Sequence, residues 1–405
     1  MSAHRTDVAR RLVARLLPVT HDLPLALRLW DGSEFTSGPP GPPQFRVIVR
    51  SPRALGRLAR RPTPLRVGQA FIDGALDVEG DLFAAMRLAH RLEDRTAPIA
   101  VRLAGLVQRL GRPWRNARRD IASHYDLPAE FYALFLDPRL VYTCAYYRHP
   151  EADLAQAQAD KLDVICRKLR LRRGDRFLDL GCGWGSLVMW AAEHYGAQAY
   201  GVTLSRAQAE WAAAAIGRAG LADRAGVEHL DYRSLPPDRR FDKIAAVGLI
   251  EHLGIARYPA FFRQVRQLLE DDGVFLNHGI TIRTGARWTS EMEFLARYVF
   301  PGLELADLST TLGAMERAGF EIADVEGLGL HYARTTRQWA ERLRAEEGRA
   351  RELVGERTYR TWLAYLAAAS VAFSEGWIGL HQTVAAHNGR GAGGAAPATR
   401  DSLYR

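Results

Sequence analysis

The stretch FLDLGCGWG, from Phe177 to Gly185, decides how the fold of this chain is predicted. A short apolar run leads to Asp179, a loop with Gly181, Gly183 and Gly185 follows, and the helical pattern SLVMWAAEHYG comes next. Glycines allow the backbone to turn sharply and to approach a ligand closely, and a helix N-terminus lies beyond the loop. The spacing GxGxG differs from the GxGxxG of dinucleotide-binding proteins, and a single glycine loop is weak evidence.

Polar residues follow the next two predicted strands, AQAYGVTLS and GVEHLDYRSL. They are Thr203, Ser205, Gln208, Asp231, Tyr232 and Arg233. In a doubly wound sheet these strand ends lie beside the first loop, where ribose hydroxyls are bound. Three adjacent strand ends of this kind favour a nucleoside cofactor over packing alone. An acidic residue before GxGxG is the S-adenosylmethionine pattern, so Asp179, Gly181 and Gly183 join the predicted cofactor-binding residues.

Composition and pattern divide the chain into four segments. Residues 1–95 predict a small N-terminal α/β domain, with an opening amphipathic helix, a strand in FRVIVRS, a strand-turn segment in FIDGALDVEGDL and a helix from about Leu82 to Leu92. Residues 96–120 predict a basic linker helix. Residues 121–388 alternate strands and helices, which predicts an α/β fold with a parallel sheet. The Gly/Ala-rich residues 389–405 predict a disordered tail.

Length and cysteine content exclude several classes of protein. The 405 residues are enough to bury a real core, and 47% of them are hydrophobic. Three cysteines without CxxC or metal-type spacing argue against a disulfide framework and a zinc site, and fit a reducing compartment. No secretory signal is evident, and no stretch approaches the roughly 20 apolar residues of a membrane span.

The formal net charge of +9 points to an anionic partner. Two runs are dense in arginine, and their members are Arg53, Arg57, Arg60, Arg61, Arg66, Arg112, Arg115, Arg118 and Arg119. Each run is either a solvated helix face or a surface that contacts anionic headgroups. No base-reading motif accompanies them, so nucleic acid is not predicted as a partner.

The stretch LVYTCAYY, from Leu140 to Tyr147, places Cys144 among three tyrosines. Taken alone, it predicts a β-rich core segment in which the cysteine acts as a small hydrophobe. The rest of the sequence offers another interpretation.

The chain resembles the cyclopropane-fatty-acyl-phospholipid synthases and the mycolic acid cyclopropane synthases. The motifs that carry the resemblance occur in the family's order over about residues 120–388, and they are HYDLPAEFYALFLD, VYTCAYY, LDLGCGWGSL, GVTLSRAQ, GLIEHLG, YVFPG and HYARTTRQW. The resemblance implies a Rossmann-like class I S-adenosylmethionine-dependent methyltransferase with a smaller N-terminal α/β domain. That domain resembles one found in the members that act on phospholipids, which favours a phospholipid substrate.

The resemblance also implies a reaction and a set of site residues. The acyl-chain olefin takes the sulfonium methyl group, and a bound bicarbonate then removes a proton from the resulting carbocation to close a cyclopropane ring. By resemblance, the bicarbonate site comprises Cys144, Glu251, His278, the backbone N–H of Ile280 and the hydroxyl of Tyr332. Tyr142 and Thr143 are expected to face the cofactor. No metal is expected.

One position departs from the family pattern, since Ala369 in AYLAAAS stands where many members have a late cysteine. We expect that cysteine to be dispensable, because a thiolate would be alkylated by the cation it faced. The leading alternative has the same cation giving a methylene- or methyl-branched chain. A non-catalytic lipid-binding protein and a small-molecule or nucleic-acid methyltransferase are further alternatives that leave the bicarbonate set unexplained.

The predicted partners are unsaturated phospholipid acyl chains and an anionic membrane surface, and a homodimer is possible. The expected location is the cytoplasm, with peripheral association at the inner face of the membrane.

Overall fold

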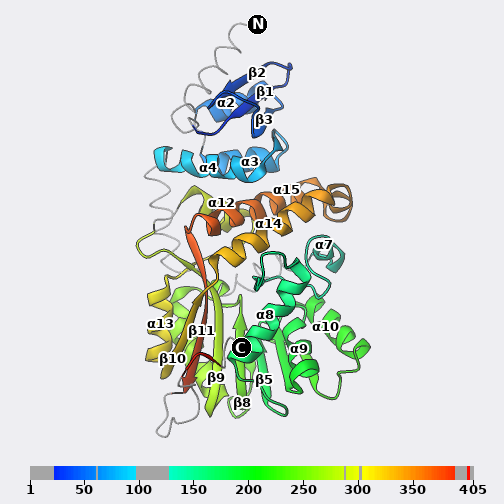
Figure 1. Cartoon of the computed structure of the whole chain (residues 1–405), viewed down its shortest axis with the longest axis vertical. Coiled ribbons are helices and arrows are strands. Elements are labelled where there is room, and N and C mark those ends of the chain that lie inside the picture. The colour runs from blue at the N-terminus through cyan, green and yellow to red at the C-terminus, as the bar shows by residue number, and fades with distance from the viewer. Residues whose placement is uncertain are drawn as a thin grey trace. The chain divides into compact units, whose positions relative to one another are not determined.

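The computed structural model describes residues 22–60, 63–96, 127–286, 289–300, 303–387 and 399–401. The chain divides into two compact units (Figure 1). The N-terminal unit comprises Met1–Leu110, Arg287–Pro301 and Ala340–Val371, and the sheet unit comprises Gly111–Ala286, Gly302–Trp339 and Ala372–Arg405. The predicted opening helix, nearly all of the linker helix and most of the tail lie outside the described residues.

A seven-stranded sheet with the order β10-β11-β9-β8-β5-β6-β7 is the centre of the sheet unit. Its strands are β5 (Arg176–Leu180), β6 (Gln198–Thr203), β7 (Ala225–His229), β8 (Phe241–Val247), β9 (Leu269–Ile282), β10 (Phe320–Gly327) and β11 (Ile378–His387). The pairs among β5 to β9 are parallel, as predicted, but β11 is antiparallel to both of its neighbours. The sheet is therefore mixed, and the prediction of a purely parallel sheet is wrong at β11.

Helices cover both faces of this sheet. They are α8 (Leu154–Lys168), α9 (Ser186–Tyr195), α10 (Arg206–Arg218), α11 (Tyr258–Leu268), α13 (Leu308–Arg317) and the first part of α14 (Gly329–Ala345), with the short α7 (Ala129–Ala133). Phe275 and Leu276 are successive residues of β9, are fully buried, and belong to two different apolar clusters. Successive strand residues point to opposite faces, so a separate core lies on each side of the sheet.

The N-terminal unit is built on a four-stranded sheet with the order β2-β1-β3-β4. Its strands are β1 (Leu25–Leu29), β2 (Glu34–Ser37), β3 (Phe45–Val49) and β4 (Leu76–Gly80), and its helices include α2 (Pro52–Arg60), α3 (Pro64–Ile72), α4 (Leu82–Thr96) and α12 (Ser290–Tyr298). The helix α15 (Glu347–Ser374) contributes its residues up to Val371. Two segments far along the chain thus belong to the same unit as the N-terminus.

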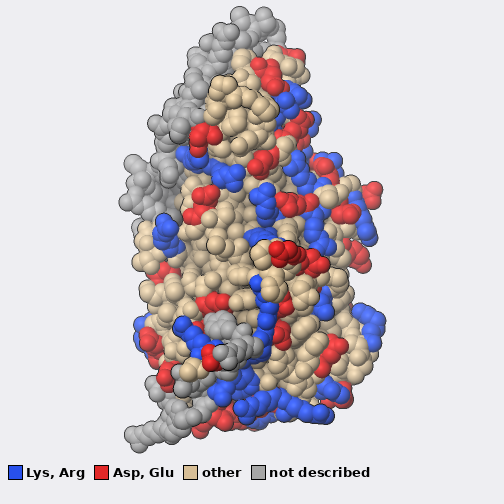
Figure 2. All heavy atoms as spheres, in the orientation of Figure 1, with Lys and Arg blue, Asp and Glu red and all other residues tan. Residues whose placement is uncertain are grey.

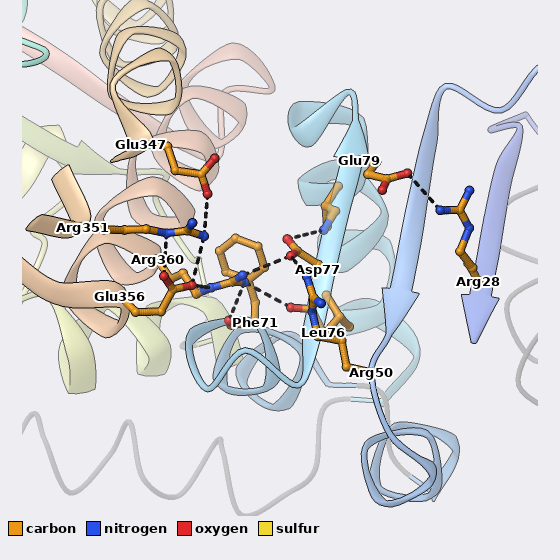
Figure 3. A network of polar contacts seen from close by, with 11 residues as sticks. Arg28, Arg50, Phe71, Leu76, Asp77, Glu79, Glu347, Arg351, Glu356 and Arg360 are labelled. Carbon is orange, nitrogen blue, oxygen red and sulfur yellow. Dashed lines mark hydrogen bonds and ion pairs between the residues drawn. The ribbon is translucent and has the colours of Figure 1, made fainter. Parts of the chain in front are cut away.

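A buried arginine of α15 ties that helix to the N-terminal sheet (Figure 3). Arg360 is 4% exposed, and its Nη1 donates to the carbonyl oxygens of Phe71 and Leu76 at 3.2 and 3.3 Å. Its Nη2 lies 3.1 Å from Asp77 Oδ2, which also pairs with Arg50 at 2.7 Å. A buried guanidinium needs such partners, because an unpaired buried charge is costly.

The predicted domain boundary near residue 95 stays a prediction.

Several predicted elements are confirmed at the level of type, including the strand at FRVIVRS, the helix beginning at Leu82 and the strands from β5 to β9. In FIDGALDVEGDL, α3 extends to Ile72 before β4 begins at Leu76. The LVYTCAYY segment is not a strand, so the β-rich prediction for it is wrong. Among the described helices, none is both long and apolar enough to cross a membrane.

Candidate active site

The glycine loop leaves open space beside its backbone. Gly181, Gly183 and Gly185 have φ values of 76°, 53° and 78°, which favour glycine. A Cβ atom at Gly185 would lie 3.0 Å from Ala212 Cβ, so this glycine serves the packing of the loop. A Cβ atom at Gly183 would meet nothing within 4 Å. The loop therefore offers an unfilled backbone surface at Gly183, which fits a ligand that approaches the chain closely.

Asp179 precedes this loop and is almost fully buried, at 3% exposure. Within the described residues, its Oδ1 has no hydrogen-bond partner, and burial raises the pKa of the carboxyl group to about 7. The ammonium group of Lys161 in α8 opposes the rise in the pKa of Asp179, and burial lowers the pKa of this lysine to about 8. An unpaired buried oxygen at the end of a strand, next to open loop space, fits the donor groups of an aminoacyl nucleoside cofactor.

The predicted polar residues after β6 mainly stabilise the start of α10. The Thr203 hydroxyl donates to Gln208 Oε1 at 2.8 Å, and Ser205 Oγ accepts from the Gln208 N–H at 3.3 Å. All three side chains are buried. These side chains lie at or after the end of the strand next to β5. Because they form hydrogen bonds to one another, fewer of their donors and acceptors remain for a cofactor than the sequence predicted.

The predicted residues after β7 also make contacts within the protein. Tyr232 packs its ring edge-on against Phe261 in the apolar core, with centroids 5.5 Å apart. Arg233 pairs with Asp231, its Nη2 lying 2.5 Å from Oδ2. The structure thus places the Tyr232 ring in the core rather than at the sheet edge, because its burial there is worth more than exposure.

The LVYTCAYY segment is held in an extended conformation by a buried carboxylate. Asp137 Oδ1 accepts the backbone N–H of Val141 at 2.8 Å and Oδ2 accepts that of Arg139 at 3.1 Å. Leu140 between them has a φ of 54°, which is rare for a residue with a side chain. This turn delivers Thr143, whose hydroxyl accepts from Lys161 Nζ at 3.0 Å and whose methyl group would lie 3.2 Å from a Cβ atom at Gly248.

Cys144 and Tyr332 meet at one carbonyl oxygen. The Cys144 thiol is fully buried and lies 3.9 Å from the carbonyl oxygen of Leu328, which also accepts the N–H of Tyr332 at 3.0 Å. Leu328 donates its own N–H to the Leu380 carbonyl, and Leu380 pairs with Ile280 across β11 and β9. Burial raises the pKa of the Cys144 thiol, so the group stays protonated. Cys144, Tyr332 and Ile280 are thus linked through Leu328 and the pairing of β11 with β9.

Glu251 is the middle residue of the short 3₁₀ helix Ile250–His252 that follows β8, and it is 4% exposed. Its Oε1 accepts the backbone N–H of Ile280 at 2.7 Å, whereas its Oε2 has no partner within the described residues. Burial raises the pKa of the carboxyl group to about 7. The Ile280 N–H is therefore engaged by Glu251, and an anion bound here would have to share or displace that bond.

His278 lies within β9, four residues before the strand ends, and is 1% exposed. Its Nδ1 is 3.1 Å from Gln382 Nε2, and its Nε2 is a buried atom that no described residue contacts by a hydrogen bond. Burial, with Lys161 and Lys168, holds the pKa of the imidazole well below its usual range. The ring is therefore neutral at physiological pH.

Aromatic side chains surround the same part of the sheet unit. Tyr142 lies 5.2 Å from Trp339 between ring centroids, and Tyr332 stacks on Phe373 at 4.5 Å and meets Trp339 edge-on at 6.0 Å. Tyr132, Phe135 and Trp184 extend the group. Ring faces of this kind attract positive charge and bury apolar chains.

Sequence reasoning missed Lys161, Lys168 and Gln382. The two lysines are spaced seven residues apart on the buried side of α8, in line with Leu154. A lysine at an apolar position of a helix was the available signal for both. Gln382 had no such signal, because its role depends on the partner strand.

A hollow lies at the edge of the sheet opposite to the glycine loop, where strands β5 to β8 begin. Its basic lining residues are Arg176, Arg224, Arg239 and Arg240. Basic side chains also gather at the lower end of the face shown in Figure 2. Arg176 pairs with Asp242 and Glu270, and Arg224 with Asp223. Arg239 lies over the ring of Tyr200, and Arg240 donates to the Leu269 carbonyl oxygen, so all four side chains are engaged by the protein and the hollow is assigned no ligand.

The mixed seven-stranded sheet and the glycine loop after β5 define a class I S-adenosylmethionine-dependent methyltransferase fold. A model of the mycolic acid cyclopropane synthetase family matches residues 113–383, and the chain belongs to this family.

Two curated relatives span nearly the whole chain. A probable fatty acid methyltransferase of Pseudomonas putida is 40% identical over 97% of this chain and 100% of its own length. A probable fatty acid methyltransferase of Mycobacterium tuberculosis is 34% identical over 95% of this chain and 96% of its own length. The solved mycolic acid cyclopropane synthase CmaA1, complexed with SAH and CTAB, is 32% identical with a TM-score of 0.63, covering 66% of this chain and 98% of that one.

Gly183→Ala is predicted to weaken S-adenosylmethionine binding about tenfold or more, because the methyl group would occupy the open space beside the loop. Isothermal titration calorimetry measures the affinity. Gly220→Ala is the matched control, since Gly220 also has a positive φ and no atom within 4 Å of its Cβ position. Gly220 follows α10, at the edge of the sheet away from the loop. Unchanged affinity in a folded Gly183→Ala protein would refute the cofactor assignment.

Glu251→Gln is predicted to stabilise the protein increasingly as the pH rises. The pKa of Glu251 is raised from 4.5 to about 7, so its contribution to stability is complete below pH 4.5 and is lost as the pH rises through 7. Glutamine cannot ionise, so the gain over wild type should grow from pH 5 to pH 8 and reach about 3 kcal/mol. Urea denaturation at several pH values measures it.

The exposed Glu316→Gln is the control for this measurement, because it makes the same substitution at the surface instead of in the interior. A pH-independent difference for Glu251→Gln would show that the carboxyl group is not buried as described.

Proposed function

We propose that this chain transfers a methylene group from S-adenosylmethionine to the cis double bond of an unsaturated phospholipid acyl chain, forming a cyclopropane ring. One observation carries the proposal. Two buried polar atoms, Glu251 Oε2 and His278 Nε2, have no partner within the described residues. Glu251 follows β8, the neighbour of the strand that leads into the glycine loop, and His278 lies in β9, next to β8. Buried polar groups are nearly always paired, so this pair points to a polar ligand beside an otherwise apolar site.

S-adenosylmethionine, when bound, supplies an electrophilic methyl group. The open backbone at Gly183 and the unpaired Oδ1 of Asp179 are the groups of this chain that would hold it. Tyr142 and Thr143, the latter positioned by Lys161, would face the cofactor.

The surroundings suit a substrate that becomes positively charged. The rings of Tyr142, Tyr332 and Trp339 provide π-faces that stabilise a cation by about 0.5–2 kcal/mol each. The Cys144 thiol stays protonated because burial raises its pKa, so it is a poor nucleophile toward that cation. A buried thiolate in its place would be alkylated by the cation.

The base that removes the methyl proton is proposed to be bicarbonate. The anion needs at least one donor and one acceptor for its own O–H, and His278 Nε2 and Glu251 Oε2 fit these two roles. Glu251 cannot attract the anion by charge, so its role would be to orient it. The Tyr332 hydroxyl and Cys144 would complete the walls of the site.

A second outcome shares the same cation and gives a methylene- or methyl-branched chain. The two relatives that match over nearly their whole length are named probable fatty acid methyltransferases, and these names agree with a branched product. Phospholipid as the substrate class rests on the N-terminal unit, which presents exposed Arg53, Arg57 and Arg66. Such residues would contribute about 1 kcal/mol each near anionic lipid, at the inner face of the membrane.

Mass spectrometry of lipids tests the proposal. Vesicles containing a cis-unsaturated phospholipid are incubated with the protein and S-adenosylmethionine that carries a trideuterated methyl group. A cyclopropane product retains two deuterons, because ring closure releases one to the base, and fragmentation separates it from a methylene branch. A methyl branch that forms by proton loss from the chain retains all three deuterons and a double bond.

We expect the two-deuteron ring product on phospholipid. The same incubation with the free fatty acid is the control for substrate class, and turnover confined to that arm would overturn the phospholipid assignment. A three-deuteron, still unsaturated product would replace cyclopropanation with methyl branching. A Gly183→Ala protein should form product more slowly from either substrate when S-adenosylmethionine is below saturation.

A further inference from the structure

We propose that Gln382 and Lys168 are positioning residues that hold His278 in the tautomer with its proton on Nε2. The proposal deepens the function proposed above and rests on it, because it assigns His278 the role of a hydrogen-bond donor in that site. It also excludes His278 as the base that removes the methyl proton. The argument follows one chain of hydrogen bonds through the sheet unit.

Gln382 reaches His278 because β11 pairs antiparallel with β9. The two residues are directly opposite one another in this pairing, and directly opposite side chains lie on the same face of a sheet. Gln382 Nε2 lies 3.1 Å from His278 Nδ1, and the two residues are 0% and 1% exposed. The contact is shielded from bulk solvent, so the orientation of the amide determines whether Nδ1 donates or accepts.

Lys168 fixes which end of the amide faces the histidine. Lys168 Nζ lies 2.8 Å from Gln382 Oε1, and an ammonium group has only donors. The amide oxygen must therefore face Lys168, and the NH₂ group must face His278. Since NH₂ only donates, His278 Nδ1 has to accept, and a neutral imidazole that accepts at Nδ1 carries its proton on Nε2.

Acidic residues of β10 hold Lys168 in its charged form. Glu326 pairs closely with Nζ, and Asp324 Oδ2 lies 3.9 Å from it. Burial lowers the pKa of this lysine, and these carboxylates oppose that shift. Glu326 also accepts the Tyr146 hydroxyl at 3.1 Å, so the chain of contacts begins in the segment that contains Cys144.

The consequence is a buried N–H at His278 Nε2 that no described residue accepts. With Nδ1 occupied and Nε2 protonated, the ring has no lone pair available to take a proton from a substrate. A neutral N–H donor can bind an anion without protonating it, so the anion can still accept a proton from the substrate. His278 therefore orients the base rather than acting as one.

The test is the protonation state of His278 read by long-range ¹H–¹⁵N correlation spectra of full-length protein labelled with ¹⁵N-histidine. The chain has 12 histidines, and the signals lost in His278→Gln identify those of residue 278. We expect a neutral ring with the proton on Nε2 between pH 6 and 8. A wild-type ring with its proton on Nδ1, or doubly protonated, would overturn the proposal.

Gln382→Glu tests the role of the amide while keeping its size. A carboxylate has no proton to donate, so Nδ1 must supply one, and the proton should move from Nε2 to Nδ1. Gln382→Met, which neither donates nor accepts, should give a mixture of tautomers and provides a second variant if the first does not fold. Thr383→Val, at the next residue on the opposite face of β11, should leave the spectrum unchanged.

Turnover in the lipid assay supplies the second readout. Gln382→Glu should lower kcat about 10- to 100-fold, the value of one oriented hydrogen bond to a charged group, with the KM for S-adenosylmethionine unchanged. An unchanged His278 tautomer in Gln382→Glu defeats the positioning role even if lipid turnover is observed. Absence of lipid turnover in wild type defeats the proposed function and leaves the spectroscopic result standing.

Discussion

The antiparallel pairing of β11 with β9 is the constraint on which the site depends. It joins Gln382 to His278 and Leu380 to Ile280 along one pair of strands. Through the Leu380 carbonyl it also fixes Leu328, whose own carbonyl receives Tyr332 and Cys144. A shift of one residue in this register would turn each of these side chains to the other face. The paired strands therefore set the positions of His278 and Ile280 in the proposed site.

A cost accompanies this arrangement. Asp179 Oδ1, Glu251 Oε2 and His278 Nε2 are buried polar atoms without partners in the described residues. Leaving such a group unsatisfied costs about 1–3 kcal/mol, and more when it is charged. The raised pKa values of Asp179 and Glu251 express the same cost, because a buried carboxyl group avoids it by remaining protonated. Ligands that supply the missing partners would recover this free energy on binding.

Features encoded locally could be predicted from the sequence. The glycine loop, the strands from β5 to β9 and the position of Glu251 after β8 follow from short patterns, and all are found in the structure. The reversed direction of β11 could not be predicted, because it is set by pairing with β9 and β10, and no local pattern distinguishes a parallel strand from an antiparallel one. The roles of Lys168 and Gln382 depend on a contact between residues 214 positions apart.

Two further differences have the same origin. Tyr232 follows a strand end as predicted, yet its ring enters the core beside Phe261 because packing there outweighs its position in the sequence. Arg360 donates to the carbonyl oxygens of Phe71 and Leu76. This contact joins segments up to 289 positions apart, and the sequence of neither segment predicts it. The motifs located the site, and the tertiary pairings defined how it is held.

The most direct test of the proposed anion site is turnover in buffer depleted of bicarbonate, followed by its addition. If Glu251 Oε2 and His278 Nε2 hold bicarbonate as the base, the wild-type protein should lose most of its lipid turnover on depletion and regain it on add-back. Equal turnover with and without bicarbonate would contradict this, and the role of base would then pass to the buried carboxyl group of Glu251.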